Sequence, residues 1–158
     1  MGSGYHRHMN APSFILGLML LAGASAAVAN PVACTPVAEQ AWIRAAPPGA
    51  TALAGYAVLR NPCAKPFVVS DVGSADFAMG MIHETKVEKG VSRMRHAKSL
   101  PLPARGVLKF EPGGKHMMLM HPRRVLKEGD RVRLVLKLAG GQKLTIDAVV
   151  RREAPTRP

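Results

Sequence analysis

Aromatic side chains are scarce in this sequence, where phenylalanine, tyrosine and tryptophan together make up 4% of 158 residues. A hydrophobic core must therefore be built mainly from valine, leucine, isoleucine, methionine and alanine. Segments with the apolar period of an amphipathic helix are also missing, whereas glycine (15) and proline (13) are frequent. This combination favours short strands joined by turns, and the chain length favours one domain.

Acidic side chains are few as well, with 10 Asp and Glu against 22 Lys and Arg and a formal net charge of +12. The basic residues are scattered over many segments and are not interleaved with aromatic residues on one element, so nucleic-acid binding is not expected. Two interpretations remain: a solvated basic surface, or a surface that attracts an acidic partner.

No apolar run is long enough for a spanning helix. The longest, Phe14 to Ala29, has 16 residues, whereas roughly 20 are needed to cross a bilayer. It follows Arg7 and ends in Ala27-Val28-Ala29, a small-residue cleavage pattern, with Ala24 to Ala26 as a second choice. We therefore predict a signal peptide over residues 1–29, export to the periplasm and no membrane insertion after cleavage before Asn30.

Only two cysteines are present, Cys34 and Cys63. An even number in an exported chain predicts a disulfide between them. A lipid anchor on Cys34 is the alternative, but Pro31 stands where the leucine of such a signal is expected. A thiol-disulfide enzyme is a weaker alternative, because the pair does not form a C-x-x-C motif.

Short apolar alternations recur from Gln40 onward, spaced as in a β-sandwich or barrel. The sequence predicts an all-β, Ig-like Greek-key sandwich of about 8–9 short strands in a domain covering residues 30–150, followed by a short tail at 151–158. The expected strands are 40–45, 55–60, 66–72, 80–88, 91–97, 106–111, 115–120, 131–138 and 142–150. Turns at Glu88-Lys89-Gly90 and at Gly140-Gly141 predict two hairpins.

Four residues stand out as candidate metal ligands: His83, Met94, His116 and Met118. His116 and Met118 are two apart on an expected strand, so their side chains leave the same face of the sheet. His83 and Met94 lie on the two arms of the expected 88–90 hairpin, nearly opposite each other. The two pairs could therefore approach one ion from two sides.

Two imidazoles and two thioethers form a soft to borderline donor set that favours Cu(I). Thioethers are not usual zinc ligands, and a blue-copper centre would need a cysteine thiolate. No paired carboxylates or nucleophile are visible, so an enzyme is not expected. The competing hypothesis is an exported Ig-like interaction module in which methionine fills the core and the histidines are structural.

With these residues identified, the chain resembles the periplasmic PCuAC-type copper chaperones, which are marked by His, ten residues, Met, twenty-one residues, His, one residue, Met. His83, Met94, His116 and Met118 fit this pattern at every spacing. The surrounding segments Ile82 to Thr85, Lys115 to Met120 and Trp42 to Ala45 are also similar. The resemblance covers about residues 33–150.

The resemblance implies a cupredoxin-like β-sandwich that receives periplasmic copper and helps to load cytochrome c oxidase, at the copper centre of its second subunit. Another copper chaperone could take part, and we expect a monomer. By strand parity, Met81 and Met120 could line the site or supply an alternative sulfur, whereas Met117 and Leu119 should point into the core. The expected surface residues are His96 and His121, and Trp42 is expected to serve packing.

Overall fold

The computed structural model describes residues 1–2 and 34–155, and the described strands all belong to the compact unit Ala33–Pro158. This part of the chain contains ten strands and no helix. The strands are β1 (Val37–Arg44), β2 (Ala52–Arg60), β3 (Phe67–Gly73), β4 (Phe77–Glu88), β5 (Val91–His96), β6 (Leu100–Leu102), β7 (Val107–Phe110), β8 (Lys115–Pro122), β9 (Arg131–Leu138) and β10 (Lys143–Arg151). The predicted all-β class is confirmed.

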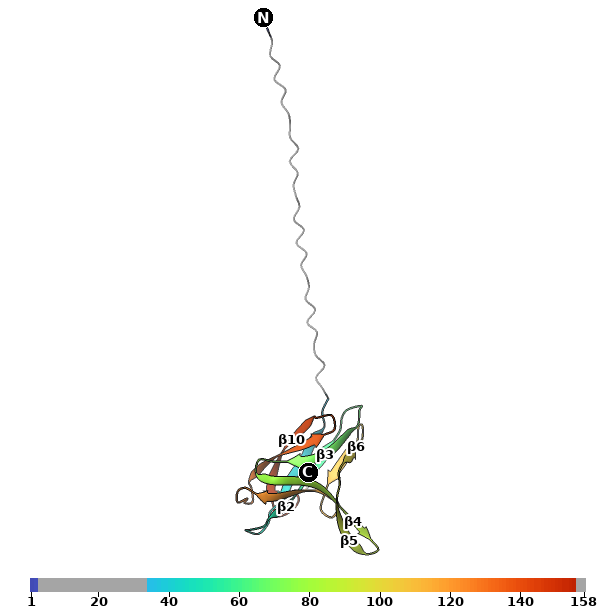
Figure 1. Cartoon of the computed structure of the whole chain (residues 1–158), viewed down its shortest axis with the longest axis vertical. Helices are drawn as coiled ribbons and strands as arrows, with labels where there is room; N and C mark the ends of the chain where they lie inside the picture. Colours follow the sequence, from blue (N-terminus) through green and yellow to red (C-terminus); the bar gives the residue numbers. More distant parts are fainter. Residues whose placement is uncertain (3–33, 156–158) are drawn as a thin grey trace. The chain divides into compact units, whose positions relative to one another are not determined.

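The strands form one continuous hydrogen-bonded path in the order β5-β4-β8-β2-β1-β10-β9-β3-β6, with β7 paired to β2 beside it. The β1–β10 pair is parallel, and the other pairs are antiparallel. The sheet folds over on itself, so that β3 packs against β4 although the two strands are not hydrogen-bonded neighbours (Figure 1). At that contact a Cβ atom on Gly80 would overlap the carbonyl oxygen of Val72, so only glycine allows so close an approach.

The core lies between the layers and is aliphatic, as the scarcity of aromatic residues predicts. In β9 the residues Val132, Leu134, Leu136 and Leu138 are buried, and they alternate with three exposed basic residues. In β4 and β8 the core-facing residues are Ile82, Met117 and Leu119, each at most 1% exposed. Met117 and Leu119 thus point inward, as predicted.

One strand was not predicted. β6 is only three residues long and contains Pro101, which cannot donate a backbone hydrogen bond. The strand lies at the end of the sheet path, paired only to β3, where a missing donor is tolerated. At the other end of the chain β10 continues to Arg151, one residue into the expected tail.

The β4–β5 hairpin projects at the lower end of the domain in Figure 1. Glu88 pairs with Val91, so Lys89 and Gly90 form a two-residue turn, and both have positive φ (52° and 77°). This is the geometry of a type I′ turn, which matches the twist of the two strands. Every residue of β5 is exposed, so β5 is held by its backbone ladder to β4 and not by core packing.

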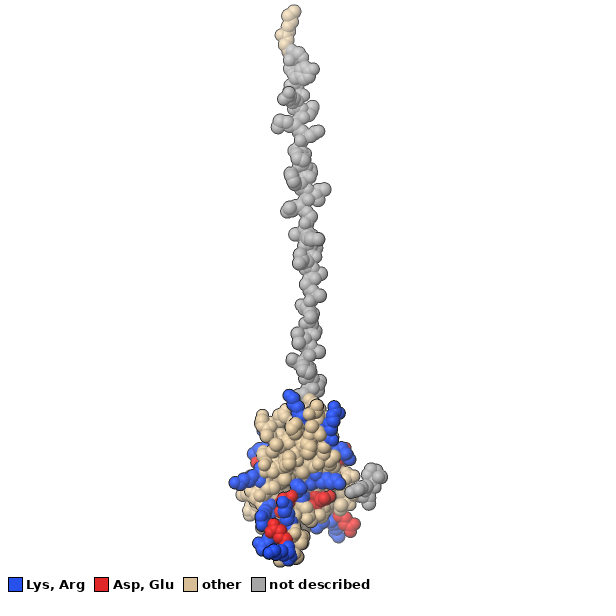
Figure 2. Space-filling view, turned by 90° about the vertical axis from the view of Figure 1, so that its right-hand side faces the viewer, with Lys and Arg blue, Asp and Glu red and all other residues tan. Residues whose placement is uncertain are grey.

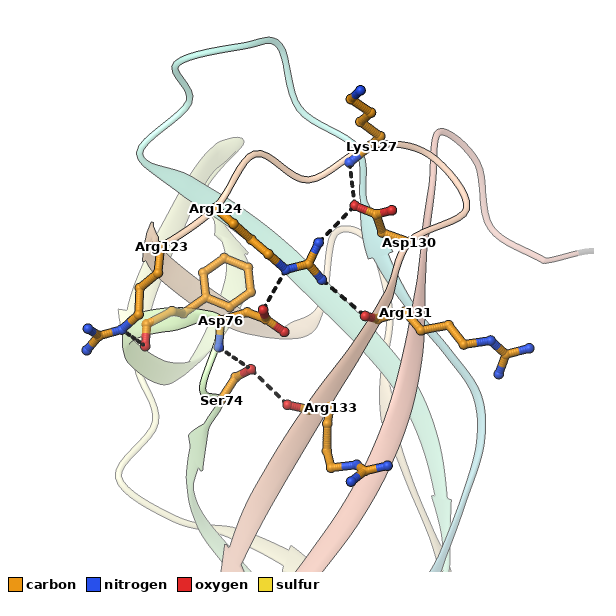
Figure 3. Close-up of polar contacts among 9 residues, drawn as sticks. Ser74, Asp76, Arg123, Arg124, Lys127, Asp130, Arg131 and Arg133 are labelled. Atoms are coloured by element: carbon orange, nitrogen blue, oxygen red, sulfur yellow. Dashed lines mark hydrogen bonds and ion pairs between the residues drawn. The ribbon is translucent and has the colours of Figure 1, made fainter.

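A polar cluster around Arg124 fixes the segment after β8 (Figure 3). The Arg124 guanidinium donates to Asp76 Oδ1 at 2.6 Å, to Asp130 Oδ2 at 3.0 Å and to the Arg131 carbonyl at 3.2 Å. Asp130 also accepts the Lys127 N–H at 2.9 Å. Hydrogen bonding to Asp76 raises the pKa of Arg124, and the Lys127 N–H lowers the pKa of Asp130.

The structure joins Cys34 to Cys63 in the disulfide that the even cysteine count predicts. It ties the segment before β1 to the turn after β2. That turn is organised by buried Asn61, whose side chain accepts the Cys63 N–H and donates to the carbonyls of Lys65 and Pro103.

Apart from its first two residues, the predicted signal peptide lies outside the described residues, as does its cleavage position before Asn30. Within ranges 1–2 and 34–155, no helix has the length and apolar character needed to cross a membrane.

Candidate metal centre

The pairing of β5, β4 and β8 places the predicted ligands on one face of the sheet. His83 pairs with His116 across β4 and β8, and Met118 follows two residues along β8. Met94 on β5 pairs with Thr85, which lies two residues beyond His83 on β4 and therefore on the same face. These residues alternate with the core-facing Ile82 and Met117, so the face that they share is the outer one.

His83 and Met94 approach each other closely, with 3.2 Å between Nδ1 and Sδ. An ion bonded to an imidazole nitrogen and a sulfur at roughly 2.0–2.3 Å would hold the two donors about 3–4 Å apart. The spacing in the structure therefore suits two ligands of one ion. Met94 is 55% exposed, so an ion between them would be reachable from solvent.

His116 is the most enclosed of the four, at 6% exposed. Its Nδ1 lies 3.0 Å from the carbonyl oxygen of Gly114. Because a carbonyl can only accept, Nδ1 must carry the hydrogen, and in the neutral ring that a metal ligand requires Nε2 is left with the free lone pair. A hydrogen bond of this kind fixes the tautomer and orientation of a ligating imidazole.

The imidazoles of His83 and His116 face each other edge to face, with centroids 5.9 Å apart. Met118, partly buried, pairs with Met81 and not with either histidine. The structure thus gathers Met94 and His116 around His83 and places Met118 one position further along the same face.

Electrostatics favour neutral imidazole at His83. Burial lowers its pKa, and the neighbouring His116 and His96 lower it further. A metal ligand must be deprotonated, so this environment reduces the competition from protons.

His96 is a neighbour that sequence analysis placed only at the surface. It is exposed, as predicted, but it also pairs with His83, with ring centroids 5.9 Å apart. Counting outward from the two-residue turn at Lys89-Gly90 would have found this pair. His121 is exposed and has no such partner among the described residues.

Aromatic packing borders the centre on the β1–β2 side. Trp42 is 4% exposed and its ring centroid lies 4.6 Å from that of Tyr56, with the Arg44 guanidinium over both rings. Trp42 thus serves packing, as predicted. Gly55, the residue before Tyr56, pairs with Met117, the residue after His116.

Charged side chains lie next to the ligands in sequence but on the opposite face of the strands, because Glu84, Lys86 and Lys115 alternate with His83 and His116. Glu84 forms ion pairs with Lys86 at 3.1 Å and Lys115 at 3.2 Å, and these hydrogen bonds lower its pKa. Figure 2 shows Lys and Arg atoms with fewer acidic atoms at the lower end of the domain, where Figure 1 places the β4–β5 hairpin. In the described part of the chain no group of three or more His, Cys, Asp or Glu side chains is arranged to hold a metal ion.

Comparison with known proteins gives one family match. The LpqE-like family model, described as "Putative lipoprotein LpqE-like", matches residues 37–150. A protein of Leifsonia xyli subsp. xyli described as "Putative lipoprotein Lxx21020" is 32% identical over 104 residues. That match covers 65% of this chain and 61% of the Leifsonia protein, so the chain accounts for less than two thirds of that relative.

Solved structures of similar fold are copper-related domains. The copper-bound PCuAC domain from PmoF2 is 27% identical with a TM-score of 0.61, covering 76% of this chain and 93% of that domain. Cu(I)-bound DR1885 from Deinococcus radiodurans is 31% identical with a TM-score of 0.58, covering 80% and 82%. Apo-DR1885 is 27% identical with a TM-score of 0.60, covering 97% of both chains. The fold is therefore the cupredoxin-like β-sandwich of PCuAC domains.

Proposed function

Because the chain belongs to the LpqE-like family and has the fold of PCuAC domains, we propose that it is a copper chaperone that carries one Cu(I) ion on His83, Met94, His116 and Met118. The observation that carries the proposal is the 3.2 Å approach of His83 Nδ1 to Met94 Sδ, beside an imidazole whose Nε2 is free. Copper is the cargo of this site, to be bound and released.

The donor set supports Cu(I) over zinc and over a redox centre. Thioether sulfur is a soft ligand suited to Cu(I) and is not among the usual ligands of zinc. Both cysteines are joined in the disulfide, so neither supplies the thiolate of a blue-copper site. Two of the structural relatives are described as copper-bound and Cu(I)-bound.

The exposure of the site supports transfer. A chaperone must pass its ion to the ligands of another protein, so its donors should be reachable and the ion weakly enclosed. Met94 is 55% exposed on a hairpin arm in which every residue is exposed. An incoming ligand can therefore approach from the β5 side while His116 still holds the ion from below.

The compartment and the recipient are part of the same proposal. The disulfide and the lipoprotein description of the family are those of exported proteins. We place the mature protein, from Asn30, in the periplasm as a monomer, where it delivers copper to a cuproprotein such as cytochrome c oxidase subunit II. Another copper chaperone could share this task.

The direct test is X-ray absorption on protein loaded with one equivalent of Cu(I) under ascorbate, together with competition against a Cu(I) chelator. We expect both sulfur and nitrogen in the first coordination shell, and Cu(I) bound more tightly than Zn(II). His121→Ala is the matched control for His116→Ala, since His121 is exposed. Full Cu(I) affinity in His116→Ala, or tighter binding of zinc, would favour the interaction-module alternative.

A further inference from the structure

Three methionines, Met79, Met81 and Met120, continue the outer face beyond Met118 of the proposed site. Met81 pairs with Met118 across β4 and β8, and Met79 pairs with Met120. The pair on the other side of Met81–Met118 is His83–His116, because side chains on one face recur every second residue. The two strands therefore carry a row of one His–His pair and two Met–Met pairs on the same face.

Core packing does not account for these methionines. Met79 is 50% exposed, and Met81, Met118 and Met120 are partly exposed. Met117, which lies between His116 and Met118 on β8, is fully buried. It shows that a methionine of this strand that serves the core points to the other face.

Neighbours on β2 leave room around these sulfurs. Ala52 pairs with Met120 and Ala54 with Met118. Alanine side chains end at Cβ, so they do not cover the thioethers.

The pairing puts the sulfurs within reach of a common ion. Directly opposed residues of an antiparallel pair have Cβ atoms about 4.5–5.5 Å apart, and diagonal neighbours are about 7–8 Å apart. Methionine is long and unbranched, so three such side chains can turn their sulfurs toward one point. An all-thioether donor set selects soft ions such as Cu(I).

We propose that Met79, Met81 and Met120 form a second Cu(I) site, adjoining the site of the proposed function at the Met81–Met118 pair. The proposal rests on the proposed function for the first site but uses none of its four ligands. Its three donors are neutral and include no imidazole, so it binds copper more weakly than the first site. Met118 lies between the two sites, so an ion could move from one site to the other without leaving this face.

The test measures how many Cu(I) ions the full chain binds, using anaerobic titration under ascorbate with native mass spectrometry, and repeats it with Ag(I), which is not redox-active. We expect two equivalents for the unaltered chain and one for the triple variant Met79→Leu, Met81→Leu, Met120→Leu. The affinity for the first equivalent should change less than threefold in that variant. Met117→Leu, on the same strand but facing the core, is the matched control and should keep both equivalents.

Methyl-labelled methionine resolves the sites in the unaltered chain, where folding of a variant is not in question. On the second Ag(I) equivalent the methyl signals of Met79, Met81 and Met120 should shift, and that of buried Met117 should not. Unshifted signals for those three, or two equivalents retained by the triple variant, would overturn the second site.

The two proposals fail differently. In the His83→Ala, His116→Ala double variant, one equivalent should remain, bound by Met79, Met81 and Met120. If that variant keeps both equivalents while the triple variant loses one, the proposed first site is wrong and the second site stands. If the double variant loses all metal, the second site is wrong and the first stands.

Discussion

His83 and Met94 approach to 3.2 Å between Nδ1 and Sδ although they are not partners in the strand ladder. Met94 pairs with Thr85, and His83 pairs with His96. The contact is therefore diagonal across the hairpin, made possible by the length of the methionine side chain. It brings a thioether to an imidazole from a strand that contributes nothing to the core.

From this contact we predict that Met94→Leu weakens Cu(I) binding at least tenfold with only a small loss of stability. Leucine is close to methionine in shape, and an exposed site adds little packing, so the cost should stay under about 1.5 kcal/mol. Competition titration against a Cu(I) chelator and urea unfolding measure the two effects. Unchanged Cu(I) affinity would remove Met94 from the ligand set.

The pH dependence of folding stability and of Cu(I) binding should follow the protonation of His83. Its pKa is lowered by burial and by the two neighbouring imidazoles, so between the folded pKa and the unfolded value of about 6.5 the unfolded chain binds more protons. The stability that neutral His83 contributes is full above about pH 6.5 and is lost as pH falls through the lowered folded pKa. The lowered pKa of His83 also means that protons compete with Cu(I) at this ligand only at a pH below its usual value.

NMR titration of the metal-free protein would measure this pKa directly. His96→Ala removes one of the two repelling rings and should raise the pKa of His83. His121→Ala should leave it unchanged. A His83 pKa at or above 6.5 in the unaltered chain would contradict the prediction.

The disulfide should contribute to stability and not to copper binding. It closes a loop between residues 29 apart, for which the chain-entropy model gives roughly 3–4 kcal/mol. The double variant Cys34→Ser, Cys63→Ser should unfold at correspondingly lower urea, with Cu(I) affinity within twofold. Intact mass separates the alternatives at Cys34, since a lipid on that sulfur would add mass and would exclude the disulfide.

The Arg124 cluster should stabilise the fold independently of the metal centre. Arg124→Gln loses the ion pairs to Asp76 and Asp130, which are solvent-screened, so we expect a small loss of stability, seen as a lower urea midpoint. Phe77–Pro122 and His83–His116 are six residues apart along β4, about 20 Å at the rise of a strand. Cu(I) affinity should therefore be unchanged. Arg123→Gln, which loses only a 3.4 Å hydrogen bond to the Phe77 carbonyl, is the control and should cost less.

Much of the fold follows from local sequence, because side chains of a strand alternate between core and solvent. The alternation in β9 and the inward direction of Met117 and Leu119 are confirmed for that reason. β6 was missed because three residues around a proline carry no period. Register shifts between Glu39 and Trp42, and between Val69 and Asp71, depend on tertiary pairing and have no such signature.

In the metal centre, too, some features follow from local sequence and others depend on long-range strand pairing. Residue type and spacing nominate His83, Met94, His116 and Met118, and strand parity puts Met81 and Met120 on their face. The proximity of His96 to His83 depends on the register set by the Lys89-Gly90 turn. The Met79–Met120 pair depends on how β4 aligns with β8, a long-range pairing that no local pattern specifies.

The position of the basic side chains predicts how copper transfer responds to salt. Lys86, Lys89, Arg93 and Arg95 lie on the hairpin that carries Met94, against Glu84 and Glu88. A positive surface beside an exposed ion speeds encounter with an acidic recipient. Between about 0.01 and 0.15 M salt the screening length falls from about 30 to 8 Å, so transfer to an isolated copper domain of cytochrome c oxidase subunit II should slow.

Charge placement, and not net charge alone, should set this rate. The pair Lys89→Gln, Arg93→Gln removes two positive charges from the hairpin, and the pair Arg131→Gln, Lys143→Gln removes two from β9 and β10, where the residues are also exposed. At about 0.01 M salt the hairpin pair should transfer copper several-fold more slowly than the β9–β10 pair, and at about 0.15 M the two should converge because screening shortens the reach of both. Stopped-flow measurement of Cu(I) transfer gives the rates. Equal rates for the two pairs at low salt, or a rate indifferent to salt, would mean that the basic surface serves solubility and does not guide docking.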